Sequence, residues 1–393
     1  MRLTITAMTL ALVTTAALPA HAARSIPSWA RKYNANCSLC HSPAVPRLNA
    51  KGIQFKWAGY RMPDEIGEKA EVDNVQDFVA ARARLRYLYE KTGGEPADRN
   101  GFVLQNVSLF AGGAIGASFG GLLEYERGEE GEVEALAVVA SAWGNSSTYR
   151  GFRIGQGHMV MAGGGVAGFD RAIGISAPVP LGAATTGVPF RFGGDAIGAE
   201  AYVVTGRNRV AFQVLNSVGV DEEARSTTKD LVVTDQFIWD DAGAGIAAAL
   251  YLGRVEGLDP LREEETSKYS RVAITANKYL GQFEVLGGYV VSRDRDLPTG
   301  SLFASATNNG AAWWLSGQYT FKSRPLTVFS RWEQVDPNSG ADNDSRNRVV
   351  LGGVLPVNVP QFMRMALEYR LDRWPGSGRS RTNGLAAEFM ITF

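Results

Sequence analysis

Apolar and polar residues alternate from about residue 75 to the end of this chain, in runs of about ten residues that turn residues separate. In one run, Arg82, Arg84 and Arg86 fall on one face of an extended strand, whereas Leu85 and Tyr87 fall on the other. A polar lumen and a lipid-facing surface explain the two faces, so the pattern is typical of a transmembrane β-barrel. A soluble β-sandwich also alternates and is the alternative fold.

The final run favours the barrel. Apolar residues occupy every second position of it up to the last residue: Leu385, Ala387, Phe389, Ile391 and Phe393. Such a strand resembles the recognition strand of outer-membrane barrels, while a soluble domain has no reason to end on an exposed aromatic residue. The sequence therefore predicts an all-β fold, an outer-membrane β-barrel of about 16 antiparallel strands, give or take about two, over residues 76–393.

One stretch also fits a membrane helix. Residues from Gly101 to Leu123 include no charged residue, and Gly112, Gly116 and Gly120 recur at intervals of four, as in helices that pack closely in membranes. The stretch contains six glycines, which disfavour an isolated helix. We interpret it as two strands around a glycine-rich turn.

The first 22 residues have the pattern of a secretory signal peptide. Arg2 supplies the positive start, residues 8–19 form an apolar stretch, and Ala20-His21-Ala22 provides a small-residue cleavage site. The apolar stretch is too short to span a membrane as a helix. We therefore expect cleavage of residues 1–22, a mature chain that begins near Ala23, and export from the cytoplasm to the outer membrane.

Cys37-Ser38-Leu39-Cys40-His41 contains the only two cysteines of the chain. Cys-x-x-Cys-His is the spacing that attaches a c-type haem, because the two thiols add to the haem and the adjacent imidazole binds the iron. A disulfide loop or a thioredoxin-like redox pair is the alternative, but a redox pair needs a βαβ setting that the sequence lacks, and neither explains the histidine. We expect one covalent haem c in a monohaem c-type cytochrome segment over residues 23–75.

This segment is short for a free-standing domain, because chains of about 50 residues are marginal without a covalent or metal staple. The haem would form its core, and another part of the protein must cover that haem. With an even number of strands, both ends of the chain lie on the periplasmic side of the barrel. The segment is thus expected to enter the barrel from that side as a haem-bearing plug.

Met62 is the candidate for the second axial ligand of the iron, opposite His41. It is the only methionine in the predicted haem segment, and a thioether ligand would raise the redox potential. A methionine that merely packs on the haem edge is the first alternative. His158, from the predicted barrel, or an open coordination site are the others.

Arg82, Arg84 and Arg86 form a second candidate group. Three guanidinium groups along one lumen-facing strand match the carboxylates of haem propionates and would fix the plug. The alternative interpretation is that these arginines form a basic part of a porin wall, whose charge acidic residues in the lumen balance.

The overall charge argues against nucleic acid as a partner. Forty basic residues balance forty acidic residues, so the chain has no excess positive field to attract phosphates.

The N-terminal region resembles the outer-membrane cytochrome-porin fusions of iron-oxidising bacteria, in which one c-type haem domain precedes a porin-like barrel. The residues that carry the resemblance are Trp29-Ala30-Arg31-Lys32-Tyr33, Cys37 to His41, Pro46-Arg47-Leu48-Asn49, Gly52, Phe55 and Gly59-Tyr60. The barrel region matches this family only in its length, its alternation and its terminal strand. The resemblance therefore supports an architecture and says little about the substrate.

The resemblance implies an electron-transfer protein with Fe(II) oxidase activity. Such a protein takes electrons from an extracellular donor, Fe(II), and passes them to a periplasmic c-type cytochrome or a similar carrier. A passive or gated porin, whose haem plug is structural or sensory, is the alternative function. The two differ in whether a donor that stays outside the membrane reduces the haem.

Overall fold

The computed structural model describes residues 28–70, 74–93, 97–157, 173–182, 196–216, 228–256, 265–298, 305–341, 344–356, 363–374 and 380–392. Its strands are β1 (Val79–Thr92), β2 (Ala97–Ile115), β3 (Phe119–Gly128), β4 (Val133–Gly144), β5 (Thr148–Gly157), β6 (Ala196–Thr205), β7 (Asn208–Asn216), β8 (Lys229–Ile238), β9 (Gly245–Glu256), β10 (Thr266–Leu280), β11 (Phe283–Arg295), β12 (Thr307–Thr320), β13 (Thr327–Asp336), β14 (Arg346–Pro356), β15 (Met363–Trp374) and β16 (Ser380–Thr392). The short helices are α2 (Ser28–Lys32), α3 (Ala50–Trp57), α4 (Val179–Gly182) and the 3-10 turns η2 (Cys37–Leu39), η3 (Pro63–Glu65) and η4 (Val75–Asp77).

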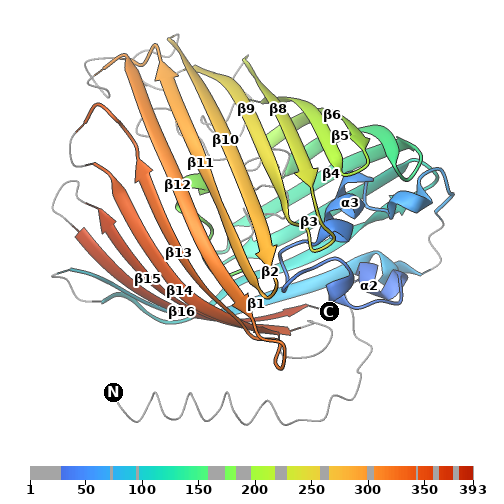
Figure 1. The fold of residues 1–393 in the computed structure, drawn as a ribbon, viewed down its shortest axis with the longest axis horizontal. Coiled ribbons are helices and arrows are strands. Elements are labelled where there is room, and N and C mark those ends of the chain that lie inside the picture. The colour runs from blue at the N-terminus through green and yellow to red at the C-terminus, as the bar shows by residue number, and fades with distance from the viewer. Residues whose placement is uncertain are drawn as a thin grey trace.

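The sixteen strands form one closed antiparallel barrel (Figure 1). Each strand pairs with its neighbours in the sequence, and β1 closes the barrel by pairing with β16, where Leu85 lies opposite Phe389. Closure leaves no strand edge with unpaired backbone groups. The predicted all-β barrel of about 16 strands is confirmed, and the β-sandwich alternative is wrong.

The strands have one inward and one outward face, as the alternation predicts. On β13, Trp332 is 53% exposed and points outward, while its neighbours Arg331 and Glu333 are buried on the inner side. On β16, Glu388 is buried and Phe389 is exposed. The outer face is therefore mostly apolar, and the inner face carries charged residues that pair with one another.

The glycine-rich stretch forms strands β2 and β3, which Gly116, Ala117 and Ser118 connect. The interpretation as two strands is confirmed. Within the described ranges, none of the helices is both long enough and apolar enough to cross a membrane.

The two ends of the barrel differ in the length of their connections. At one end, two residues join β6 to β7 (206–207) and another two join β10 to β11 (281–282). At the opposite end, 38 residues (158–195) separate β5 from β6, and 12 residues (217–228) separate β7 from β8. We call these the short-turn end and the long-loop end. Bacterial barrels place short turns in the periplasm and longer loops outside the cell.

Residues 28–70, here the N-terminal segment, lie inside the short-turn end, and Figure 1 shows α2 and α3 at that end of the barrel. Side chains bridge the segment to three strands that lie far apart in the barrel: Arg47 to Glu284 of β11, Trp57 to Gln236 of β8, and the carbonyl of Val45 to Arg364 of β15. Because these strands lie on different sides of a closed barrel, the segment occupies the lumen at this end.

The last part of the segment is fixed to the turn between β2 and β3. The guanidinium group of Arg61 is almost fully buried and donates to the carbonyl oxygens of Ala117 at 2.6 Å and Phe119 at 2.5 Å. The backbone N–H of Ala70 donates to the carbonyl of Gly116 at 2.9 Å. Burial lowers the pKa of Arg61, and these carbonyl oxygens supply the hydrogen bonds that its charge needs.

Part of the long β5–β6 connection also folds into the lumen. Glu368 on β15 accepts hydrogen bonds from the backbone N–H groups of Ile175 at 2.8 Å and Ser176 at 3.2 Å. Arg364 donates to the carbonyls of both Val45 and Ile173, at 2.9 and 3.3 Å. The connection and the N-terminal segment therefore meet on the inner wall.

Three of the sequence predictions fall on residues outside the described ranges. These are the signal peptide over residues 1–22, the alternative ligand His158 and the terminal residue Phe393.

Candidate functional site

The Cys37–His41 loop is one tight turn. Residues Cys37–Leu39 form the 3-10 turn η2, and the side chain of Asn36 caps it by accepting from the N–H of Ser38 at 3.0 Å. The N–H of His41 donates to the carbonyl of Cys37 at 2.9 Å. These bonds hold both cysteines and the histidine on a single turn of chain.

Helix α3 packs against this loop through its first residues. The side-chain amide of Asn49 donates to the carbonyls of Ser38 and Leu39, at 3.0 Å each, and its oxygen caps α3 by accepting from the N–H of Gly52 at 3.0 Å. A Cβ atom at Gly52 would lie 2.2 Å from the carbonyl oxygen of Cys40. Only glycine fits there, because the contact is with backbone that cannot move aside.

Both cysteines and His41 line a cavity of about 270 Å³ between the N-terminal segment and the inner wall of the barrel. The segment contributes an apolar side that includes Trp29 and Phe55. The facing side comes from six strands: Ala80 and Arg82 of β1, Phe110 and Gly112 of β2, Leu122 and Glu124 of β3, Leu136 and Val138 of β4, Arg153 of β5, and Thr392 of β16. A mostly apolar space beside two cysteines and a histidine fits a large apolar cofactor with a few charged groups.

The imidazole of His41 is held in one orientation. Its Nδ1 lies 2.9 Å from the carbonyl oxygen of Arg47. A carbonyl can only accept, so Nδ1 carries the proton and Nε2 keeps the lone pair that binds a metal. A second hydrogen bond of this kind is the usual way in which proteins orient a metal-binding histidine.

Arg47 links this histidine to the barrel wall. Its guanidinium group forms a two-pronged ion pair with Glu284 of β11, at 2.8 and 3.1 Å, and both side chains are almost fully buried. Glu284 also accepts from Asn277 at 2.6 Å. The pairing with Glu284 raises the pKa of Arg47 although burial opposes this, so Arg47 stays charged. One residue thus orients His41 through its backbone and contacts the barrel through its side chain.

The two cysteines are free thiols, and burial raises the pKa of both Cys37 and Cys40 to about 11. Catalytic redox cysteines need the opposite shift, because the thiolate is the reactive form. The surroundings therefore disfavour the thioredoxin-like alternative.

Of the three predicted arginines, Arg82 alone lines the cavity. Arg84 donates to Asn106 at 2.6 Å, and Arg86 donates to Glu388 at 2.7 Å. Every second residue of a strand lies about 6.6 Å further along it, so Arg84 and Arg86 point into the same lumen but progressively further from the cavity. Their predicted contact with a cofactor stays a prediction, and their described partners fit the basic-wall alternative.

Sequence reasoning missed Arg153 of β5, which lines the cavity together with Arg82. Arg153 donates to the carbonyl of Lys56 on the N-terminal segment. Arg82 pairs with Glu124 at 3.0 Å and with Glu126 at 2.8 Å. The Nε atom of Arg153 lies 3.7 Å from a carboxylate oxygen of Glu200. Both arginines that line the cavity are therefore also paired with carboxylates of the inner wall. No local signal marks Arg153, because only the closed strand order brings β5 to this place.

Met62 lies in an aromatic cluster beside the cavity. It is buried with Phe55 and Tyr60, and Trp29 packs against the same cluster. The ring centroids of Trp29 and Phe55 lie 5.0 Å apart. The indole N–H of Trp29 donates to the carbonyl of Gly112 at 2.8 Å. Met62 is not among the described residues that line the cavity. Its role as a ligand stays a prediction, and its surroundings resemble the packing alternative.

No protein-family model matches this chain, and no curated protein matches it either. Among solved structures, it is similar to OmpF of Salmonella typhi in complex with daunomycin (TM-score 0.57, 13% identity, 80% of this chain and 97% of that chain). It is also similar to an anion-selective porin from Comamonas acidovorans (0.56, 11%, 80% and 98%) and to the outer membrane channel DcaP of Acinetobacter baumannii (0.56, 10%, 84% and 100%). The fold is that of the outer-membrane porins. At these identities, the similarity shows the fold alone.

Proposed function

We propose that this protein is an outer-membrane electron conduit. It accepts electrons from an extracellular donor, Fe(II), through one covalent haem c, and it passes them to a periplasmic carrier such as a c-type cytochrome. One observation carries the proposal: the Cys-x-x-Cys-His loop faces a cavity whose other side is the inner wall of a closed barrel. A group attached to this loop lies within the barrel and not beside it.

The residues present fit a haem c. Cys37 and Cys40 are close in sequence and line the same cavity, as two thioether links require, and Nε2 of His41 has the lone pair that an iron ligand needs. Arg82 and Arg153 are the arginines at the cavity that would contact the two propionates, in exchange for part of their contacts with Glu124 and Glu200. When bound, haem c supplies one-electron exchange at its iron.

The chain's own residues fix this site and limit water around it. Trp29, Phe55 and Leu122 give the cavity apolar walls, and a low-polarity surrounding raises the potential at which a metal site accepts an electron. Arg47 and Arg61 fix the segment on two sides of the barrel, so its distance from each mouth is constant. A constant distance is what electron transfer across a membrane needs.

Two segments of the chain occupy part of the lumen, which favours an electron conduit over a wide pore. The N-terminal segment occupies the short-turn end, and residues 173–182 pack on the inner wall at Glu333 and Glu368. The apolar band of such barrels is about 25 Å tall. One redox group within the lumen divides the distance between the two surfaces into two shorter steps, whereas a group on either side of the membrane leaves the whole distance to be crossed.

The alternative is a passive or gated porin whose haem plug is structural or sensory. The porin fold of the similar structures favours it, because that fold serves diffusion through a lumen in the anion-selective porin. The two functions differ in one property. A conduit moves electrons without moving iron, whereas a porin moves solutes.

A vesicle experiment separates the two. The haem-loaded protein is placed in vesicles with its long-loop end outward, and the vesicles enclose an oxidised c-type cytochrome. Fe(II) is added outside, either free or in a bulky chelate that cannot pass a pore. We expect both donors to reduce the enclosed cytochrome.

The Cys37→Ser/Cys40→Ser double variant is the matched control, because it keeps the barrel and loses the attachment. We expect it to support neither reaction. Reduction by free Fe(II) through this haem-free barrel would mean that iron passes through a pore, and the conduit proposal would fail. Failure of the loaded protein with both donors would reject Fe(II) as the donor.

A further inference from the structure

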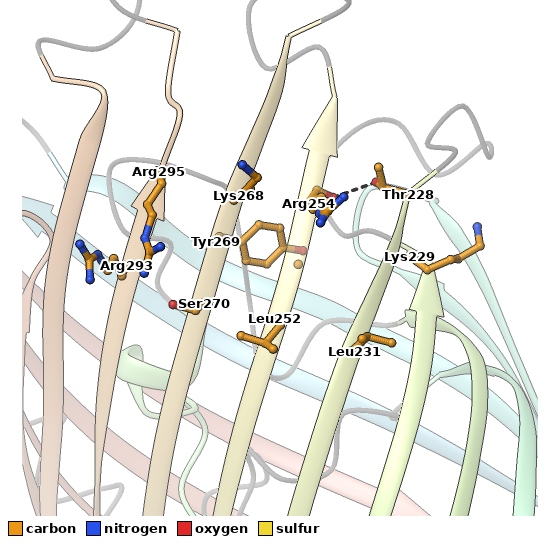
Figure 2. A pocket seen from close by; sticks show the side chains of 11 residues that line it. Thr228, Lys229, Leu231, Leu252, Arg254, Lys268, Tyr269, Ser270, Arg293 and Arg295 are labelled. Carbon is orange, nitrogen blue, oxygen red and sulfur yellow. Dashed lines mark hydrogen bonds between the residues drawn. The ribbon is translucent and has the colours of Figure 1, made fainter.

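A second cavity, of about 560 Å³, lies on the outer face of the barrel near the long-loop end (Figure 2). It spans β8 to β11. The side chains of Lys229, Leu252 and Arg293 lie on the outward face of these strands, whereas Tyr269, which also lines the cavity, is buried on the inner face. Five of the residues that line it are basic: Lys229, Arg254, Lys268, Arg293 and Arg295. Among the residues that the structure describes, none that lines the cavity is acidic. This cavity is distant from the Cys37–His41 loop and plays no part in the proposed electron transfer.

Three of these cations form a row across neighbouring strands. Arg254 of β9 lies opposite Lys268 of β10, and Lys268 lies opposite Arg295 of β11. Residues at such positions are about 5 Å apart at their Cβ atoms, and like charges there repel each other. Asp296 pairs with Lys268 at 2.8 Å, but both side chains are more than half exposed, so this pair contributes little. The row therefore concentrates positive charge at one place on the outer face of the barrel.

The row lies at the border of the apolar outer face. Leu231 and Leu252 line the same cavity and are 42% and 45% exposed. They lie deeper along the strands than Arg254, Lys268 and Arg295, as Figure 2 shows. Still deeper, the outward positions are apolar: Val233, Leu250, Val272 and Val291. In a membrane-spanning barrel, this border is where lipid headgroups meet acyl chains.

The small side chain of Ser270 explains why a cavity lies between the basic row and the apolar residues. It lies between Leu252 and Arg293 in the next cross-strand row, and its side chain is far smaller than either neighbour. Leucine side chains therefore border the cavity on one side, and guanidinium groups border it on the other. Its shape and charge suit a ligand with an apolar body and a phosphorylated head.

We propose that this cavity binds a phosphorylated glycolipid of the outer leaflet. The phosphates contact Arg254, Lys268 and Arg295, and an acyl chain lies along Leu231 and Leu252. Arginine forks bind phosphate in a bidentate way, and basic pockets at the level of headgroups select anionic lipids. The site requires an outer-membrane barrel with its long-loop end outside the cell, and it does not require the haem.

The test measures lipid bound to the intact protein in mild detergent by native mass spectrometry. The probes are bisphosphorylated lipid A, the same lipid without its phosphates, phosphatidylglycerol and inorganic phosphate. We expect retention of bisphosphorylated lipid A alone. The Arg254→Gln/Lys268→Gln/Arg295→Gln variant should bind it at least about tenfold more weakly, since each lost charge-assisted contact reduces affinity.

Two further variants keep the result interpretable. Arg150→Gln/Lys322→Gln/Arg324→Gln removes the same charge from exposed positions nearer the short-turn end, and it should bind lipid A as the wild type does. Ser270→Trp keeps every charge but fills the cavity, so it should also lose binding. Migration of folded barrel on unheated gels confirms that each variant is intact. Equal binding of phosphatidylglycerol or dephosphorylated lipid A, or equal loss in both triple variants, would overturn the proposal.

Discussion

The barrel and the N-terminal segment are held together by different kinds of interaction. Backbone hydrogen bonds join each strand to two neighbours around the whole barrel, so its stability is spread over every strand. The segment has only short helices, and a few buried side chains fix it to the wall, among them Arg47, Arg61 and Trp57. The barrel, which many backbone hydrogen bonds hold, should tolerate a single substitution. The segment, which a few side-chain contacts hold, should not.

This difference gives the two regions separate weaknesses. A buried ion pair that loses one partner costs about 3–5 kcal/mol, because the remaining charge stays buried and unpaired. A substitution at such a contact should therefore release the segment and leave the barrel folded. If the segment and the barrel are held separately, each variant of the segment should show a released segment together with a folded barrel.

The largest expected effect is the loss of covalent haem. The Cys37→Ser/Cys40→Ser variant should contain none, whereas the mature wild type should exceed its chain mass by the mass of one haem. Intact mass spectrometry and the absorbance spectrum measure this. The barrel of the variant should still migrate as a folded barrel on unheated gels. Covalent haem in the variant would disprove the attachment site.

The next largest effect should come from Glu284→Gln. This change leaves Arg47 charged and buried without its carboxylate partner, so docking of the segment should weaken by about 3–5 kcal/mol. Limited proteolysis and hydrogen exchange should show faster opening of residues 28–70, with unchanged protection of the strands.

Glu129→Gln is the matched control for that variant. It removes one carboxylate from an exposed pair, in which Arg99 is 48% exposed, so the change should be under about 1 kcal/mol. Equal opening of the segment in both variants, or loss of strand protection in Glu284→Gln, would show that segment and barrel are not held separately.

The barrel strands could be predicted from the sequence, because the pattern that defines each strand is local. Alternation is a local property of each strand, so the inner place of Arg82 and the outer place of Leu85 follow from residue order alone. The strand count follows from the length of the region. The tight Cys37–His41 turn was likewise predictable, because its chemistry requires consecutive residues.

The contacts of the segment with the wall were not predictable from residue order. Arg47 and Glu284 are 237 positions apart, and nothing in residue order indicates that they form a pair. Arg153 reaches the cavity only because β5 lies four strands from β1 in the closed barrel. The group Arg82, Arg84 and Arg86 was predicted as a unit from its alternation. Arg82 lines the cavity, and contact of Arg84 and Arg86 with a cofactor stays a prediction.

A smaller effect concerns the thiols of the haem-free chain. Burial raises the pKa of Cys37 and Cys40 from 9.0 to about 11, so the thiolate fraction at pH 8 should be about a hundredfold lower than for an ordinary cysteine. Alkylation should be correspondingly slow at pH 8 and should accelerate as the pH rises toward 11. Unfolding in denaturant should restore the ordinary rate at pH 8. A fast rate in the folded chain would mean that the loop is exposed and the segment is not docked.

The smallest expected effect separates the two roles of Met62. If its sulfur binds the iron, Met62→Ala and Met62→Leu should both lower the midpoint potential and change the spectrum to a high-spin or water-ligated form, because both lack the thioether. If Met62 only packs among Phe55 and Tyr60, Met62→Leu should leave spectrum and potential unchanged, since leucine keeps nearly the same volume, whereas Met62→Ala should destabilise the segment by about 2–5 kcal/mol. The leucine variant is therefore the decisive one. A silent Met62→Leu spectrum would reject Met62 as the ligand, and His158→Ala would be the next variant to measure.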